Sequence, residues 1–376
     1  MGLFSSRKVK EPAYIVCTVE AHSVSCAIYL RKEKPEIIFA VRDNLIYKRH
    51  PSAKRIFDKV NTLFKNLLVN SVLPFIRENG ELYEFVHATI VHSLLWSHEE
   101  SKYISHRGEK EFILTEEYVN NIIDTEHNKV GKEDNFKVVA SRISNMHING
   151  YVTPNMFGKS AKFFSCRLQR TLVDKTFLEK IEESLHSVVK TDVIHATEFD
   201  LFDVFIPFVG AESKMFAISF GSETVEIAIY NHIERKDSVS VPVGIETLVR
   251  GIALKVHENE SVAFSHILSL SRGERVPTKT ELDTINNSMK SLRLKVNKAL
   301  FDIGESIEGI KSIICIYPES YRDISIYFLK NFLCNNSISV IDPYTAKGYR
   351  DSIKIRQPIN YIDPLVEISV LSANKK

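Results

Sequence analysis

The fold is decided by the stretch Met215-Phe-Ala-Ile-Ser-Phe-Gly-Ser-Glu-Thr-Val-Glu-Ile-Ala-Ile-Tyr230. Two apolar runs flank a polar turn around Gly221, and this pattern predicts a strand, a tight turn and a second strand. An equivalent pair lies near the N-terminus, where the apolar run Tyr14–Val19 is followed by Ser23–Leu30. We therefore expect the chain to contain the same kind of hairpin twice.

The second strands of the two pairs align without a gap. Ser23-Val-Ser-Cys-Ala-Ile-Tyr29 matches Thr224-Val-Glu-Ile-Ala-Ile-Tyr230 in the pattern Val-x-x-Ala-Ile-Tyr. Each pair is followed by a third apolar run, at Ile37–Val41 and at Ser238–Val243. A short shared pattern together with a repeated order of three strands indicates a duplicated α/β unit. Ligands of such two-part proteins usually bind in the cleft between the parts.

Helical patterns follow each strand triplet. Ala53–Arg77 carries apolar residues at the spacing of one buried helix face, and Ile245–His257 and Glu281–Phe301 follow the second triplet. The series closes with a strand at Ile313–Tyr317, a helix at Asp323–Cys334 and a strand at Ser337–Ile341.

A stretch of different texture separates the two units. Its expected elements are strands at Phe85–Trp96, Asn135–Ile148 and Ala161–Leu172, and helices at Thr115–Ile123 and Lys175–Val188. This pattern predicts a small α+β subdomain, strand-helix-strand in character, inserted into the first unit. The expected division gives residues 1–85 and 173–210 to the first domain, 86–172 to the insertion, 211–355 to the second domain and 356–376 to a C-terminal tail.

The composition is that of a globular protein and argues against several function classes. The chain has 376 residues, 44% hydrophobic and 26% charged, with a net charge of +2. A nearly neutral balance without a basic stripe argues against nucleic-acid binding. The apolar runs are far shorter than the roughly 20 residues of a membrane span. Five cysteines without a Cys-x-x-Cys pair indicate buried thiols in a reducing compartment, and the scattered histidines predict no metal site.

Several motifs share their order and spacing with one known family. They are Met1-Gly-Leu-Phe4, Asn149-Gly-Tyr151 with Pro154 and Gly158-Lys-Ser-Ala-Lys162, Phe220-Gly-Ser-Glu-Thr-Val-Glu226, and Val241-Pro-Val-Gly244 with Ile252-Ala253. With these motifs the chain resembles the actin-like family that includes the pilus protein PilM and the division protein FtsA. The resemblance covers nearly the whole chain. It implies an α/β, actin-like fold of two duplicated ribonuclease-H-like domains with an inserted small α+β subdomain.

The phosphate loops of that family are altered in this chain. In the family each loop begins with an aspartate followed by glycines, whose amides bind phosphate. The first loop here has Thr18 in place of the aspartate and Glu20 in place of the first glycine. The second loop has Ser219 in place of the aspartate. A carboxylate at Glu20 would repel a phosphate at close range in a cleft.

The region that holds adenosine in the family departs further. Tyr317 and Pro318 stand where a pair of glycines is expected, and proline lacks an amide donor. We expect Tyr317 to fill the space that a base needs. The ribose-contacting helix of the family carries Glu and Lys, whereas Phe264 and Ile267 occupy those places here. The resemblance therefore implies a nucleotide site too eroded for ordinary ATP hydrolysis.

Two functions remain open at this point. The first is a non-catalytic cytoplasmic scaffold that couples an inner-membrane protein to a pilus-like assembly and needs no cofactor. The alternative is an FtsA-like, nucleotide-binding filament former or ATPase in cell division, which would bind ATP with magnesium. If a nucleotide binds, the resemblance assigns its contacts to Ser23, Gly221, Ser222, Thr224, Glu226 and Gly244.

The resemblance also implies a partner. In PilM-like proteins a short cytoplasmic tail of a membrane protein docks between the first domain and the insertion. By analogy, the strand near Phe85–Trp96 and the segment Asn149–Ala161 should border such a groove. FtsA-type proteins carry a C-terminal amphipathic helix, whereas the tail Val366–Lys376 alternates like a strand. We therefore expect no direct membrane insertion, and the sequence leaves self-association open.

We predict that the purified protein does not turn over ATP at a useful rate, because Thr18, Ser219 and Pro318 stand where acids and glycines are expected. Phosphate release with ATP and Mg²⁺ should equal the buffer background. Stimulated release that Glu226→Ala abolishes would overturn the prediction, since an ATPase with rewired acids would have to use Glu20 or Glu226.

Overall fold

The computed structural model describes residues 9–45, 53–93, 95–130, 135–152, 156–210, 214–306, 310, 312–333, 339–346, 348–356, 359 and 362–375. The opening motif Met1–Phe4, Pro154 and Cys334 lie outside these residues. The chain divides into two compact units. Unit 1 combines Met1–Leu95 with Lys180–Lys376, and unit 2 is Trp96–Glu179.

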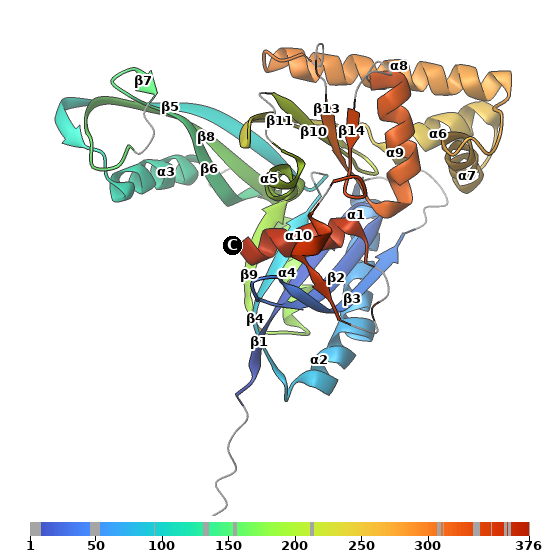
Figure 1. Ribbon diagram of the computed structural model, residues 1–376, viewed down its shortest axis with the longest axis horizontal. Coiled ribbons are helices and arrows are strands. Elements are labelled where there is room, and N and C mark those ends of the chain that lie inside the picture. The colour runs from blue at the N-terminus through green and yellow to red at the C-terminus, as the bar shows by residue number, and fades with distance from the viewer. Residues whose placement is uncertain are drawn as a thin grey trace, which may run out of the picture. The chain divides into compact units, whose positions relative to one another are not determined.

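Unit 1 contains two sheets, and the first is built on the N-terminal hairpin (Figure 1). Its strand order is β15-β3-β2-β1-β4-β9. The strands are β1 (Glu11–Val19), β2 (Ser23–Leu30), β3 (Glu36–Asn44), β4 (Tyr83–His92), β9 (Asp192–Thr197) and β15 (Lys354–Ile355). The helices of this part are α1 (Ala53–Leu67), a π-helical turn (Leu68–Val72), α2 (Leu73–Asn79) and α4 (Lys175–His186).

The second sheet repeats the plan of the first. Its order is β12-β11-β10-β13-β14. The strands are β10 (Met215–Phe220), β11 (Val225–Asn231), β12 (Glu234–Val241), β13 (Ser312–Ile316) and β14 (Ser339–Ile341). Its helices are α6 (Ile245–Val256), α7 (Glu260–Ser271), α8 (Lys279–Asp302) and α9 (Arg322–Phe328). β10 pairs antiparallel with β11 and parallel with β13, as β1 does with β2 and β4. The duplicated unit expected from the sequence is therefore present.

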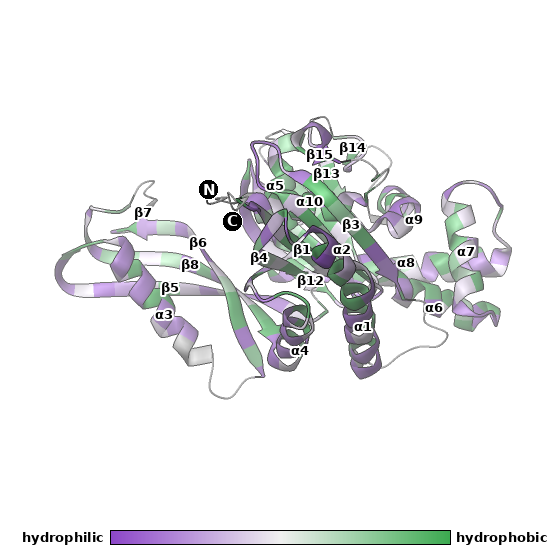
Figure 2. Ribbon diagram, turned by 90° about the horizontal axis from the view of Figure 1, so that it is seen from below, coloured by the Kyte–Doolittle hydropathy of each residue, from purple (hydrophilic) through white to green (hydrophobic). Residues whose placement is uncertain are grey.

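Two helices fill the space between the sheets of unit 1. They are α5 (Glu198–Val209) and α10 (Pro364–Lys375), and Figure 1 shows α10 crossing the middle of the unit. Their apolar side chains form one buried cluster with Val16 and Tyr29 of the first sheet and Ala217 and Tyr230 of the second. Figure 2 shows the strands around this cluster largely in the green of hydrophobic residues, with purple residues along α1. Each buried large apolar side chain contributes about 1.5–3 kcal/mol to such a core.

The expectation of a strand-like C-terminal tail is wrong. Residues 364–375 form α10, with Pro364 at its first position and Asp363 accepting a hydrogen bond from the Leu365 amide at 2.8 Å. Val366, Ile368 and Val370 alternate because every face of this helix is buried between the two sheets, so that the apolar positions do not reveal a single stripe. Among the described residues, no helix is both long enough and apolar enough to cross a membrane.

The assignment of Phe85–Trp96 to the insertion is also wrong. The strand β4 belongs to the first sheet of unit 1, where it lies between β1 and β9 and forms parallel ladders with both. Ala88 and Ile90 of this strand are fully buried. Because both edges of β4 are paired, it offers no free backbone edge to a docked peptide. The compact inserted unit begins later than expected, at Trp96, and extends to Glu179.

Unit 2 is a four-stranded sheet with one helix. Its strands, in the order β5-β8-β6-β7, are β5 (Ser97–Ile113), β6 (Phe136–Ile148), β7 (Tyr151–Val152) and β8 (Ser160–Asp174), and its helix is α3 (Glu116–Val130). A core around Leu114, Phe164 and Leu168 joins helix and sheet. No apolar pattern predicted β5, because it is an edge strand with mostly exposed, polar residues.

Replacing Ile368 in α10 by alanine should reveal how much this helix contributes to the stability of unit 1. Ile368 is fully buried, so Ile368→Ala should lower the free energy of unfolding by about 2–5 kcal/mol in urea titrations. Leu294→Ala on α8 is the control, because Leu294 is 62% exposed, and it should change stability by less than about 0.5 kcal/mol. If Ile368→Ala does not fold, Ile368→Val should still cost about 0.5–1.5 kcal/mol. Equal effects at positions 368 and 294 would contradict the buried position of α10.

Candidate functional site

The two hairpins of unit 1 bring buried polar groups together around the start of α5. Glu20 follows β1, Ser219 lies in β10, and Glu198 is the first residue of α5. The Ser219 hydroxyl is hydrogen-bonded to the Glu198 carboxylate, and Glu198 is close enough to Glu20 to raise its pKa. The two positions where the resemblance leads us to expect acids thus have Thr18 and Ser219, while the carboxylates come from neighbouring residues.

Burial dominates the chemistry of these two carboxylates. It raises the pKa of Glu20 to about 8, and the negative charges of Glu198 and Asp363 act in the same direction. The Arg42 guanidinium and a 2.9 Å hydrogen bond from the Ser23 hydroxyl oppose the shift. Burial also raises the pKa of Glu198 to about 7. Both groups therefore hold their protons at a pH where an exposed carboxylate is ionised.

Arg42 joins this cluster to the C-terminal helix. Its Nη1 is hydrogen-bonded to Asp363, which caps α10, and its Nη2 donates to the Ser23 hydroxyl at 3.0 Å. Asp363 also accepts the Glu319 amide at 3.1 Å. The guanidinium is thus engaged in holding the first sheet to the second half of unit 1. In the described ranges no cluster of His, Cys, Asp or Glu side chains is arranged to hold a metal ion.

The loop between β10 and β11 uses the amides at the start of α6. The Ile245 amide donates to the Gly221 carbonyl at 3.0 Å, and the Glu246 amide donates to the Ser222 carbonyl at 2.9 Å. Gly244 permits this close approach, because a Cβ atom there would lie 2.3 Å from the Ser222 carbonyl oxygen. Amides at a helix N-terminus are common phosphate donors, but these two already have carbonyl partners.

The same loop contains an ion pair. Both carboxylate oxygens of Glu223 accept hydrogen bonds from the Arg250 guanidinium of α6, at 2.7 and 2.6 Å. Thr247 of the same helix also contacts Glu223, at 3.3 Å. A bidentate arginine–carboxylate pair is a strong, geometrically specific contact. Arg250, which is the cationic residue among the buried residues of α6, is therefore already bound by the loop.

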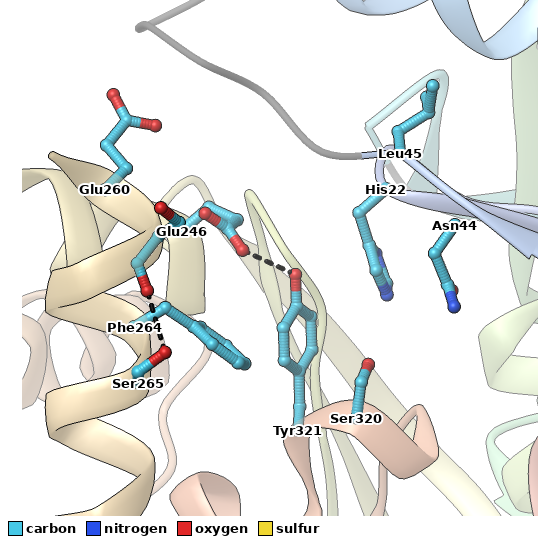
Figure 3. A pocket seen from close by; sticks show the side chains of 10 residues that line it. His22, Asn44, Leu45, Glu246, Glu260, Phe264, Ser265, Ser320 and Tyr321 are labelled. Carbon is cyan, nitrogen blue, oxygen red and sulfur yellow. Dashed lines mark hydrogen bonds between the residues drawn. The ribbon is translucent and has the colours of Figure 1, made fainter.

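A cavity of about 300 Å³ opens between the first hairpin and the helices of the second sheet (Figure 3). The first half of unit 1 contributes the His22 turn and the end of β3, and the second half contributes α6, α7 and the turn before α9. The lining residues are His22, Asn44, Leu45, Glu246, Glu260, Ser261, Phe264, Ser265, Ser320 and Tyr321.

Three aromatic side chains, those of His22, Phe264 and Tyr321, line this cavity. The Tyr321 hydroxyl donates a hydrogen bond to Oε1 of Glu246 at 2.9 Å, and the Tyr321 side chain is buried. The His22 ring packs on Tyr321 with 4.5 Å between ring centroids, and the Phe264 ring lies 6.1 Å from Tyr321. Figure 3 shows the three rings side by side. His22 belongs to the first half of unit 1 and the other two to the second, so these rings connect the halves.

The structure corrects the expectation for Tyr317. This residue is fully buried in the core beneath the second sheet, and its hydroxyl is hydrogen-bonded to Asp342. Tyr321 lines the cavity instead, because the chain turns through a 3-10 helix at Glu319–Tyr321 directly after Pro318. Phe264 lines the cavity as well, whereas Ile267 is buried in the core and does not. Sequence analysis missed Tyr321, the aromatic residue that directly precedes α9.

The residues assigned to a nucleotide lie in two places. Gly221, Ser222, Thr224 and Gly244 meet where the β10–β11 loop contacts α6, and Glu226 is fully buried on β11 opposite Ser219. Ser23 lies in the other half of unit 1, beside Glu20. The six residues that we assigned to nucleotide contacts are absent from the lining of the described cavity.

The sequence matches no protein-family model and no curated protein. A chain of a PilM–PilN type IV pilus biogenesis complex superposes on it with a TM-score of 0.62 at 8% identity, over 96% of this chain and 98% of that chain. A Bacteroides thetaiotaomicron protein with an actin-like ATPase fold gives a TM-score of 0.42 at 11% identity, over 98% and 99% of the two chains. The ethanolamine utilization protein EutJ from Carboxydothermus hydrogenoformans gives 0.43 at 9%, over 90% and 87%. The expected actin-like fold class is confirmed, and the fold is shared with a chain of the PilM–PilN complex.

We predict that Glu20→Gln stabilises the protein increasingly as the pH rises. The pKa of Glu20 is about 8 in the folded protein and 4.5 ordinarily. Between these values the folded state keeps a proton that the unfolded chain has lost, so this group makes the protein less stable as the pH increases from 4.5 to 8. Glutamine removes that penalty, which at pH 8 has an upper limit of roughly 4 kcal/mol.

The measurement is the free energy of unfolding of wild type and variant between pH 5 and about pH 8. Glu78→Gln on α2 is the matched control, because Glu78 is exposed and its replacement should have a small, pH-independent effect. A difference between wild type and Glu20→Gln that stays constant or shrinks with rising pH would show that Glu20 is not a buried acid.

Proposed function

We propose that the chain is a non-catalytic, actin-like scaffold that joins an inner-membrane protein to a pilus-like assembly of the PilM type. One contrast carries this proposal. The actin-like frame extends over nearly the whole chain, whereas the groups that would contact a nucleotide are engaged by the chain itself. If the fold is kept but a nucleotide is not bound, the protein acts through contacts of its surface with partners rather than through catalysis.

The contacts around the phosphate loops support the absence of a nucleotide. The first two amides of α6 already bind the Gly221 and Ser222 carbonyls. The Glu223 carboxylate occupies the second loop and holds Arg250. Glu20 places another acid in the first loop. A triphosphate between these loops would find few unused donors and no spare positive charge in a partly dehydrated site, where an uncompensated charge is costly.

The partner in this proposal comes from the likeness in fold. The structure with a TM-score of 0.62 belongs to a complex of two type IV pilus biogenesis proteins, PilM and PilN. By analogy, this chain would lie in the cytoplasm at the inner face of the cell membrane and bind the cytoplasmic tail of an inner-membrane protein. This is an argument from fold to function, and it therefore needs a direct test of binding.

Unit 2 offers a place for such a partner. Ile113 ends β5, Phe157 lies in the turn before β8, and Tyr151 opens β7. Register brings them to the same end of the sheet, since Ile113 pairs with Ser160. All three are half-exposed or more, with Tyr151 at 77%. Exposed aromatic and aliphatic side chains that gather at one end of a sheet are typical of contact surfaces, and two of these three fall within the segment first expected to border the groove.

Photocrosslinking in the native cell tests this proposal. A photoreactive phenylalanine analogue at position 157 should give an adduct with a membrane-spanning protein that has a short cytoplasmic tail. A synthetic peptide of that tail should then bind the purified full chain, and Phe157→Ala should weaken the binding about tenfold or more, the loss of an interface anchor of at least about 1.4 kcal/mol.

Position 294 is the matched control, because Leu294 is similarly exposed but lies on α8 in unit 1. The same analogue at 294 should give no such adduct. Adducts solely between copies of the chain would favour the filament-forming alternative. A tail peptide that fails to bind, or that binds Phe157→Ala as well as wild type, would sink the proposed contact.

A further inference from the structure

The cavity beside His22 and Tyr321 has an acidic wall. Glu246 and Glu260 contribute carboxylates, and among its described lining residues there is no lysine or arginine (Figure 3). The guanidinium of Arg250 on α6 is already engaged, because both of its Nη atoms donate to Glu223. A phosphate is therefore the wrong ligand for this cavity, and a positively charged group is the right one.

Glu246 shows the same imbalance in its titration. Burial raises the pKa of Glu246, and the negative charges of Glu223 and Glu260 raise it further. The hydrogen bond from Tyr321 and the charge of Arg250 lower it without cancelling the effect of burial. The ionised carboxylate at Glu246 is thus insufficiently compensated by the protein, and a cation in the cavity would supply the missing positive charge.

His22 provides an independent sign of a missing ligand. It is 95% buried, since its exposed fraction is 5%, and it lines the cavity. Neither ring nitrogen has a hydrogen-bond partner in the described part of the chain, and the approach of Nε2 to the Glu20 carboxylate is 3.5 Å. Burial and the nearby Arg42 charge hold the pKa of His22 well below its usual range, so the ring is neutral. A buried imidazole with unused hydrogen-bonding capacity is costly unless a ligand completes it.

The aromatic rings complete the chemistry of the site. His22, Tyr321 and Phe264 line the same cavity, with centroid separations of 4.5 and 6.1 Å from Tyr321 to the other two. The faces of such rings attract cations, and a planar guanidinium can stack on them in addition. Carboxylates beside aromatic faces are the usual surroundings of a bound organic cation.

We propose that this cavity binds an organic cation, specifically a guanidinium group on a short alkyl stem. Glu246 and Glu260 supply the compensating negative charge, Tyr321 and Phe264 supply aromatic faces, and His22 supplies a ring nitrogen that can accept a hydrogen bond. Five donors in one plane suit two carboxylates and an imidazole better than the point charge of an ammonium group does. A volume of about 300 Å³ is at the lower end for ligand sites, which suits such a head group.

This proposal does not rest on the scaffold function, because it concerns the cavity in unit 1 and not the surface of unit 2. The guanidinium has two possible sources, a free small molecule or an arginine side chain of a bound peptide. Both present the same group to the cavity, so the experiment must distinguish them by what is attached to the stem.

The test is ligand binding to the purified full chain, measured by calorimetry. The probes are propylguanidinium, the neutral and similarly shaped propylurea, and ATP with Mg²⁺. Propylguanidinium should bind saturably, and propylurea should bind at least about tenfold more weakly, a difference of about 1.4 kcal/mol. ATP with Mg²⁺ should not compete. A capped Gly-Arg-Gly peptide that binds more tightly than propylguanidinium identifies an arginine side chain as the source, whereas weaker binding of the peptide identifies a small molecule.

Variants connect the binding to the cavity. Glu260→Gln and Tyr321→Phe should each weaken the binding of propylguanidinium, the first by loss of a charge partner and the second by loss of the hydroxyl that positions the Glu246 carboxylate. Glu78→Gln, outside the cavity lining, should leave it unchanged. Circular dichroism establishes that each variant is folded. Equal binding of propylurea and propylguanidinium, no saturable binding of either, or unchanged affinity in folded Glu260→Gln would overturn the proposal.

Discussion

The burial of α5 and α10 between the two sheets is the contact on which the rest of unit 1 depends. One apolar cluster includes residues of both sheets and both helices, so neither half can bury its inner face without the other. Apolar contacts do not by themselves fix an orientation, whereas hydrogen bonds do. Arg42 provides such hydrogen bonds, because it binds Asp363 and Ser23 and so joins β3 and β2 to the cap of α10. The polar groups above the core are held at fixed positions as a consequence.

Burial explains why the polar groups at this level differ so much from ordinary surface acids. Glu20 and Glu198 lie in the same dehydrated space and share little positive charge, so that each holds its proton to an unusually high pH. The second loop differs, since both carboxylate oxygens of Glu223 accept hydrogen bonds from the Arg250 guanidinium. One end of the site therefore compensates its acid by protonation and the other by pairing. Neither arrangement leaves spare positive charge for a phosphate.

The sequence predicted those parts of the fold whose residues alternate between a buried and an exposed face, or repeat along the chain. The hairpins at Met215–Tyr230 and Tyr14–Leu30 followed from apolar runs around a turn, and the amphipathic helix α8 followed from its stripe. The structure of α10 could not be read in this way, because a helix buried on all sides has no stripe. Similarly, β4 was correctly predicted as a strand but was assigned to the wrong sheet, because its partners β1 and β9 cannot be identified from the local sequence. The site residue Tyr321 was missed for Tyr317 because a single 3-10 turn after Pro318 decides which of the two faces the cavity.

The cavity combines groups from the two halves of unit 1, and this has a thermodynamic consequence. His22 comes from the first hairpin, whereas Glu246, Glu260 and Phe264 come from helices packed on the second sheet. A ligand that contacts both sets binds best when the halves have the separation seen here, and its binding free energy therefore favours that separation. In an actin-like frame a nucleotide between the halves would act in the same way through its phosphates. A cation held between His22 and the carboxylates of α6 and α7 would favour the same separation, although its charge is opposite to that of a phosphate. Because a cation of this kind is not hydrolysed, its effect would depend only on its binding equilibrium.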